Sequence, residues 1–122
     1  MTQPERRTAP RIATQLPLRL ADDHQEIIAH AQNISASGVY CTLSRFIAPM
    51  TKLQIQFDLP DRHRSTRIRC QGVVVRAEPA IPNPQQACYN VAIFFNDLSE
   101  RHRLAIARYV QRHDARSPQQ SG

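Results

Sequence analysis

The sequence predicts a small all-β domain, a six-stranded antiparallel β-barrel followed by one C-terminal α-helix. Three observations support this fold class. Six short segments have strand-like alternation or composition, turn-forming residues separate them at fairly regular intervals, and the hydrophobic period becomes helical only near the C-terminus. A chain of 122 residues suits one domain with a modest core, so a ligand is expected on the surface or in a shallow groove.

The clearest strand is expected at residues 52–59, where apolar and polar side chains alternate without a break. Its apolar face carries Leu53, Ile55, Phe57 and Leu59. The other strands are expected at residues 15–20, 26–33, 39–44, 67–74 and 88–95. Pro17 predicts an edge strand or a bulge in the first of these, and Gly72 predicts a bulge in the fifth. Residues 77–86 contain three prolines and are expected to form a long loop.

The two ends of the chain differ from this pattern. Residues 1–14 are polar and basic and are expected to be a flexible arm, which leaves residues 15–113 for the barrel with its helix. Asp97 is the expected N-cap of the helix, with Glu100 at capping-box spacing. Residues at helical spacing then follow: Leu98, His102, Ile106, Tyr109, Val110 and His113. Residues 114–122 have the composition of a disordered tail.

The charge balance predicts an anionic partner. The chain has 16 Lys and Arg against 10 Asp and Glu, and all but Lys52 of the basic residues are arginine. The planar guanidinium group binds phosphate or carboxylate through paired hydrogen bonds and stacks on aromatic rings. No apolar run is long enough for a membrane span or a signal peptide, so a cytoplasmic protein without membrane insertion is expected.

The chemistry-bearing residue types do not form a catalytic or metal-binding pattern. The three cysteines are widely spaced, which argues against a disulfide framework and a zinc site, and Cys41 and Cys70 fall on apolar strand faces where burial is expected. The five histidines are scattered, and no nucleophile–base pair is suggested by spacing. We therefore expect a protein that is not an enzyme and that uses no metal or cofactor.

Two local clusters remain. The first contains three arginines, Arg6, Arg7 and Arg11, within the arm. The second is the polar turn Asn33-Ile34-Ser35-Ala36-Ser37-Gly38 at the end of a strand. Taken separately, the first also fits a solvated basic tail, and the second fits a hairpin whose Asn and Ser bond local backbone groups.

Taken together, the two clusters resemble the motifs of the PilZ family, the bacterial receptors for cyclic di-GMP. The first family motif, R-x-x-x-R, reads Arg7-Thr8-Ala9-Pro10-Arg11 with Arg6 before it, and the second, [D/N]-x-S-x-x-G, begins at Asn33. The resemblance extends over about residues 5–112 and implies the barrel, the terminal helix and a site for cyclic di-GMP. The ligand-binding residues that it implies are Arg6, Arg7, Arg11, Asn33, Ser35 and Gly38.

The residue types suit this ligand. Arginine matches the O6 and N7 acceptors of guanine, pairs with phosphate and stacks over a purine face. Asn33 and Ser35 would face the same way in an extended segment, with the Asn33 amide oxygen accepting a guanine N–H. Gly38 would allow a positive φ or a close approach of the ligand to the backbone. Arg76 is a further candidate, because a strand at this position lends a side chain to guanine in some family members.

The leading hypothesis is therefore a receptor whose arm becomes ordered on binding cyclic di-GMP and that signals to a downstream protein. One alternative is an adaptor of the same fold that acts by protein contact and binds no nucleotide. Another is a barrel for single-stranded nucleic acid, which is disfavoured because three of its seven aromatic residues, Phe57, Tyr89 and Phe95, fall on apolar faces. We expect neither DNA nor RNA as a partner. The second basic stretch (Arg62, Arg64, Arg67 and Arg69) is interpreted as a solvated hairpin.

Overall fold

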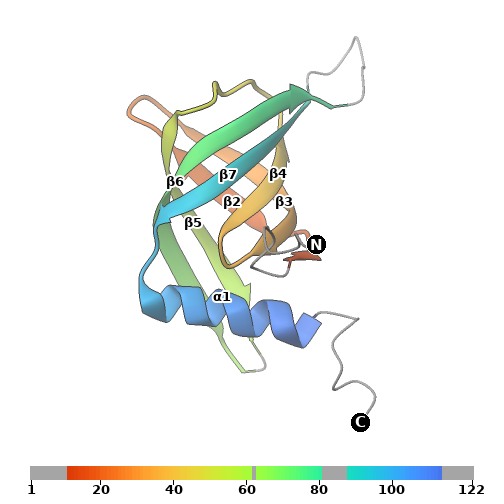
Figure 1. Ribbon diagram of the computed structural model, residues 1–122, viewed down its shortest axis with the longest axis vertical. Coiled ribbons are helices and arrows are strands. Elements are labelled where there is room, and N and C mark those ends of the chain that lie inside the picture. The colour runs from red at the N-terminus through yellow and green to blue at the C-terminus, as the bar shows by residue number, and fades with distance from the viewer. Residues whose placement is uncertain (1–10, 62, 81–87, 114–122) are drawn as a thin grey trace, which may run out of the picture.

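The computed structural model describes residues 11–61, 63–80 and 88–113, which form seven strands and one helix (Figure 1). The elements are β1 (Arg11–Ala13), β2 (Pro17–Ala21), β3 (Glu26–Ser35), β4 (Gly38–Leu43), β5 (Lys52–Pro60), β6 (Ser65–Pro79), β7 (Tyr89–Asp97) and α1 (Glu100–His113).

Strands β2 to β7 form a closed antiparallel barrel. They are hydrogen-bonded in the order β3-β2-β5-β6-β7-β4, and the pairing of β4 with β3 closes the sheet. The expected six-stranded antiparallel barrel with a C-terminal helix is confirmed, with β1 as an additional strand. Closure leaves the barrel wall without a free edge except where a strand extends past its neighbour.

Strand β1 pairs with the part of β3 that extends past the end of β2. Strand β2 pairs with the first part of β3, from Glu26 to His30, and β1 pairs with its last residues on the same side. The connecting residues continue this edge, because the Thr14 amide donates to the carbonyl of Gln32 at 3.0 Å. Residues 11–13, which we assigned to the flexible arm, are thus a strand that satisfies backbone groups of β3. The other residues of the expected arm and tail, 1–10 and 114–122, lie outside the described residues.

Two expectations about prolines were wrong. Strand β2 lies between β3 and β5, so it is neither an edge strand nor bulged at Pro17. Pro17 is its first residue, a position that proline tolerates because it needs no amide donor there. Strand β6 continues through Pro79 into the expected loop, because Ala77 and Glu78 pair with β7.

The bulges arise where paired strands differ in residue count. A register shift lies next to Gly72, as expected, although the extra residue is Asn96 on β7. A second shift between β6 and β7 makes Val75 the extra residue of β6. A third makes Gln32 the extra residue of β3 opposite β4. These bulges change which residues face outward farther along each strand.

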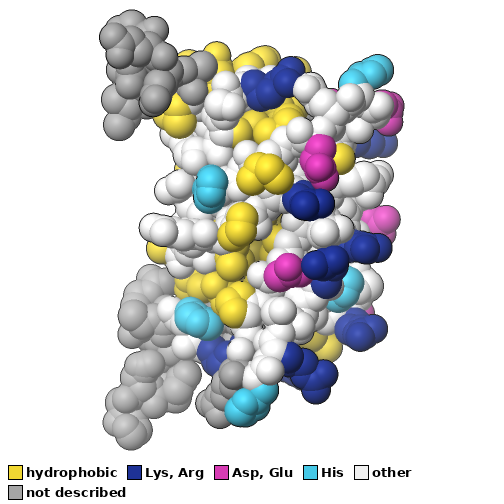
Figure 2. Space-filling view, turned by 180° about the vertical axis from the view of Figure 1, so that it is seen from behind, with side chains coloured by type: hydrophobic (Ala, Val, Ile, Leu, Met, Phe, Trp, Pro, Cys, Tyr) yellow, Lys and Arg dark blue, Asp and Glu magenta, His cyan; other side chains and the backbone are white. Residues whose placement is uncertain are grey.

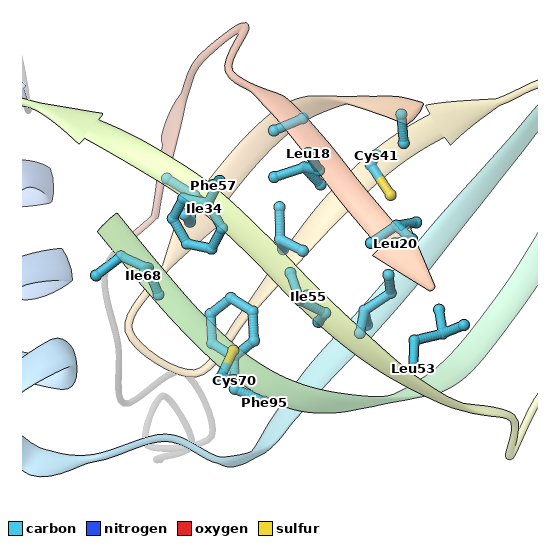
Figure 3. Close-up of a cluster of buried hydrophobic side chains, with 14 of the residues drawn as sticks. Leu18, Leu20, Ile34, Cys41, Leu53, Ile55, Phe57, Ile68, Cys70 and Phe95 are labelled. Carbon is cyan, nitrogen blue, oxygen red and sulfur yellow. The ribbon is translucent and has the colours of Figure 1, made fainter. Parts of the chain in front are cut away.

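The core fills the barrel with side chains from all six barrel strands, as Figure 3 shows. The rings of Phe57 and Phe95 are stacked with their centroids 6.3 Å apart. Cys41 and Cys70 are buried, as expected, and loss of solvation raises the pKa of each thiol to about 12, with a smaller contribution from Asp97 at Cys70.

Helix α1 lies across one end of the barrel (Figure 1), with Ile106, Tyr109 and Val110 buried against it. The expected N-cap at Asp97 was wrong, because β7 extends through Asp97 by pairing with Gln71. Ser99 caps the helix instead, and its hydroxyl accepts the His102 amide at 3.1 Å. Within the described part of the chain, no helix has both the length and the apolar composition needed to cross a membrane.

Candidate functional site

The two motif segments meet where β1 pairs with the end of β3. Arg11 lies opposite Ser35, and Ala13 lies opposite Asn33. The Arg11 side chain reaches diagonally along this pair, and its Nη1 donates a hydrogen bond to Oδ1 of Asn33 at 3.0 Å. Arg11 and Asn33 are 22 residues apart, so the fold joins the last residue of one motif to the first residue of the other. The expected ligand residues Arg6 and Arg7 lie outside the described residues.

The bulge at Gln32 sets the direction of Asn33. Ala31 faces Cys41 and both are fully buried, but the next pairing is between Asn33 and Tyr40. After this shift Ile34 is the buried residue and Asn33 is half-buried on the outer surface. Without the extra residue, strict alternation from Ala31 would direct Asn33 into the core. The bulge therefore presents the amide side chain to the outside of the barrel.

Ser35 holds the turn of the second motif. The residue is fully buried, and its Oγ accepts the Ser37 amide at 3.1 Å. The hydroxyl groups of Ser35 and Ser37 also lie 3.1 Å apart, and Ser35 Oγ donates to the Gly38 carbonyl at 3.5 Å. These bonds occupy the Ser35 side chain within the turn and fix the geometry of the chain between β3 and β4.

Position 38 requires a glycine because the backbone of the neighbouring strand β7 lies very close to it. Its φ is not positive, so the left-handed conformation considered from the sequence was wrong. A Cβ on Gly38 would lie 2.4 Å from the carbonyl oxygen of Ile93, closer than any such contact tolerates. The amide of Phe95 also donates to the carbonyl of Ser37 at 3.0 Å. The close approach that Gly38 allows is therefore made by β7, which is held directly against the motif.

A row of outward-facing residues crosses four strands from the motif. Asn33 on β3 pairs with Tyr40 on β4, Tyr40 pairs with Ala92 on β7, and Ala92 pairs with Arg76 on β6. Residues paired in this way point to the same side of a sheet. Asn33, Tyr40 and Ala92 are half-buried and Arg76 is exposed. Arg76, the further candidate from the sequence, thus lies on the outer surface that carries Asn33.

The bulge beside Arg76 contributes to this arrangement. Val74 is fully buried and pairs with Ile93. Because Val75 is the extra residue, Arg76 rather than Val75 pairs with Ala92.

Tyr40, on the same outer surface, was missed by the sequence reasoning. Its outward direction is visible from the apolar neighbours Val39 and Cys41, but its position beside Asn33 depends on the β3–β4 pairing.

Elsewhere on the barrel, basic side chains are accompanied by acidic ones. Figure 2 shows them close together on one face, with exposed hydrophobic side chains nearby. Arg19 lies 3.6 Å from Glu26, and Arg67 lies 2.9 Å from Asp58. The hydrogen bond from Arg67 lowers the pKa of the Asp58 carboxyl. Surface pairs of this kind contribute little to stability and offset the local positive charge.

These pairs border a shallow groove of about 440 Å³, which is lined by Pro17, Leu18, Arg19, Ile28, Gln56, Phe57, Asp58 and Arg67. The groove is lined by β2, β3, β5 and β6 and contains none of the motif residues. Among the residues that the structure describes, no group of three His, Cys, Asp or Glu side chains is placed to hold a metal ion.

The protein is thus a small β-barrel domain in which the two motif segments pair with each other. The model of the PilZ domain family matches residues 5–112, and the chain belongs to this family. PilZ domains are receptor or adaptor domains rather than enzymes, and the family includes receptors for cyclic di-GMP.

Solved structures with this fold include the Bacillus subtilis inhibitor of motility MotI/DgrA, which aligns with a TM-score of 0.79 and 19% identity over 95% of this chain and 53% of that chain. The PilZ domain of Escherichia coli YcgR with cyclic di-GMP has a TM-score of 0.67 and 10% identity over 95% and 97% of the two chains. A longer YcgR chain in complex with cyclic di-GMP has a TM-score of 0.68 and 12% identity, and 49% of it is covered. This chain thus spans about half of MotI and of the longer YcgR chain. No curated protein matches the sequence.

Proposed function

We propose that this PilZ domain is a cytoplasmic receptor for cyclic di-GMP, which binds on the outer surface of the barrel where β1 meets the end of β3. The observation that carries the proposal is the hydrogen bond between Arg11 and Asn33, which joins the two motifs of the family pattern in one place. Arg6 and Arg7 precede Arg11 in the sequence and complete the arginine set from the N-terminal side.

The hydrogen-bonding capacity of this pair suits a guanine nucleotide. A guanidinium group has five N–H donors, so Arg11 retains donors for a phosphate or for the O6 and N7 edge of guanine while it holds Asn33. The carbonyl oxygen of Asn33 has a second lone pair for a guanine N–H. Arg11 therefore orients the amide as well as contributing charge. Ser35 and Gly38 act through the turn, which keeps Asn33 in position.

The signal would pass to a downstream protein through the N-terminal arginines. When they become ordered around cyclic di-GMP, which carries two phosphate charges, both the shape and the charge of the surface beside β1 and β3 would change. A partner that recognises this altered surface would distinguish the bound receptor from the free one. Arg76 lies on the same outer surface and is a candidate for the far side of the ligand.

One observation favours a second function, that of an adaptor without nucleotide. Ser35 is satisfied within its turn and Asn33 accepts from Arg11, so these motif residues stabilise the fold without a ligand. In an adaptor of this kind, the outer surface of the barrel would bind a protein directly.

Isothermal titration calorimetry of the full chain with cyclic di-GMP tests the proposal, with GTP as the comparison ligand. We expect micromolar or tighter binding for cyclic di-GMP and none for GTP. The double variant Arg7→Ala/Arg11→Ala should lose binding. Arg69→Ala is the matched control, because it removes an exposed arginine that faces outward on β6 opposite Gln56. Absence of heat and of any thermal stabilisation at high ligand concentration would reject the receptor function and favour the adaptor.

A further inference from the structure

An exposed aromatic ring lies directly beside the second motif. On β7, Ile93 and Phe95 are 2% and 5% exposed, whereas Phe94 between them is 50% exposed. Phe94 therefore faces outward from the barrel wall. A single exposed apolar side chain is common on protein surfaces, so its neighbours decide whether it forms part of a site.

Gly38 keeps this ring next to the motif. Phe94 pairs with Gly38, and a Cβ placed on Gly38 would lie only 3.3 Å from the Phe94 Cα. The hydrogen bond from the Phe95 amide to the Ser37 carbonyl holds the strand in this register. Gly38 is buried and has no side chain, so no β4 side chain stands directly opposite the Phe94 ring. Phe94 and the motif turn are thus fixed relative to each other.

Tyr40 provides a second ring on the same surface. It is half-buried and faces outward, because its neighbours Val39 and Cys41 are 2% and 0% exposed. Tyr40 pairs with Ala92, and Gly38 pairs with Phe94, so Tyr40 and Phe94 are diagonal neighbours on adjacent strands. Diagonal positions of an antiparallel pair are within reach of aromatic side chains.

The two rings flank small residues and adjoin the polar part of the site. The direct partners of Phe94 and Tyr40 are Gly38 and Ala92, whose side chains together amount to one methyl group. On its other side Tyr40 pairs with Asn33, which carries the amide held by Arg11. The two outward-facing rings thus have only small residues as their direct partners on β4 and β7, with hydrogen-bonding groups on the Asn33 side. Planar heterocyclic bases with polar edges fit a surface of this kind.

We infer that Tyr40 and Phe94 form a stacking platform for the guanine bases of the ligand. The inference rests on the proposed receptor function and adds to it the residues that bind the base faces. The platform supplies affinity without selecting a base, since every base has a π-face. Selection of guanine remains with Arg11 and Asn33, which bond its edges. Loss of either ring should therefore weaken binding while the preference for guanine is kept.

The absence of tryptophan from the sequence allows a direct test, because Phe94→Trp becomes the single tryptophan of the protein. Guanine stacked on this indole should quench its fluorescence on addition of cyclic di-GMP, with a midpoint that agrees with calorimetry. Phe46→Trp is the control. Phe46 is similarly exposed, at 52%, but it lies in the β4–β5 connection and packs edge-on against Tyr89. The fluorescence of a tryptophan at this position should therefore not respond to the ligand.

Binding measurements on ring-deletion variants complete the test. Tyr40→Leu and Phe94→Leu should each weaken cyclic di-GMP binding by about tenfold or more, whereas Tyr40→Phe should retain it because the ring remains. If both leucine variants bind with wild-type affinity and Phe94→Trp is not quenched, the platform is overturned while the receptor function stands. No binding by the wild-type chain would overturn both. Quenching by a single-stranded oligonucleotide and none by cyclic di-GMP would also overturn the platform for this ligand.

Discussion

The side-chain hydroxyl groups of Thr14 and Tyr109 lie 3.1 Å apart and share a hydrogen bond. Thr14 follows β1 directly, and its amide is bonded to Gln32 of β3. Tyr109 belongs to the buried face of α1 and is 6% exposed. Strand β1 also carries Arg11, so this bond connects the segment that positions the candidate site to the helix at the end of the barrel.

Removing this bond should destabilise the domain without unfolding it. We predict that Tyr109→Phe lowers the free energy of unfolding by about 1 kcal/mol, the usual net value of a partly buried hydrogen bond. Urea denaturation measures the change. Thr14→Val should have a similar effect, and the double variant should be little worse than either single one. Fully additive losses would show that the two hydroxyl groups do not interact.

The barrel was predictable because its signals are local. Alternation over residues 52–59 is visible within one segment, and the structure forms β5 over these residues and Pro60. The bulges were less accessible, since an extra residue such as Gln32 is defined only against the partner strand. The same reason explains the incorrect helix cap. Asp97 has the residue type of an N-cap, but its pairing with Gln71 keeps it in β7 and leaves the cap to Ser99.

The motif residues of the candidate site could be predicted from the sequence, but the residues that surround them in the fold could not. Arg11 and Asn33 were recognised by residue type and spacing, whereas their hydrogen bond results from the pairing of β1 with β3. Phe94 lies far from both in the sequence and reaches the motif only through the β4–β7 pairing. The role of Gly38 was also misjudged in part, because the need for glycine comes from the carbonyl of Ile93.

That carbonyl leads to a prediction about Gly38. A Cβ at this position would meet the backbone oxygen of Ile93 at 2.4 Å, and the backbone has little freedom to move away. We predict that Gly38→Ala lowers the free energy of unfolding by at least about 2 kcal/mol. Gly72→Ala is the comparison, because its two closest contacts, at 2.6 and 2.7 Å, are side-chain carbons of Ile55 and Ile93, and the nearest backbone atom, the Phe94 oxygen, is farther away at 3.1 Å. Equal losses in the two variants, measured in urea, would contradict this explanation.

The hairpin between β2 and β3 should contribute a pH-dependent stability. Oδ1 of Asp22 accepts the amides of His24 and Gln25 at 2.8 and 2.9 Å, and these bonds lower the pKa of the carboxyl below its ordinary 3.8. Since the folded-state pKa is the lower one, this stability is present above pH 3.8 and is lost as the pH falls through the folded-state pKa.

Asp22→Asn keeps an acceptor oxygen and removes the charge. We predict that it is less stable than the wild type at neutral pH, and that the difference shrinks as the wild-type carboxyl becomes protonated. Urea titrations at several pH values measure the difference, and an NMR titration of the Asp22 carboxyl measures its pKa directly. A stability difference that stays constant through the acid range would contradict the lowered pKa.

The three cysteines should differ sharply in reactivity. Burial raises the pKa of the Cys41 and Cys70 thiols to about 12, so neither forms the reactive thiolate near neutral pH, whereas Cys88 is exposed. We predict that a thiol reagent modifies one of the three cysteines rapidly in the folded protein and all three in denaturant. Cys88→Ser should abolish the rapid phase and leave the unfolding midpoint unchanged. Rapid modification of a second thiol in the folded protein would show that Cys41 or Cys70 is accessible through an opening of the barrel.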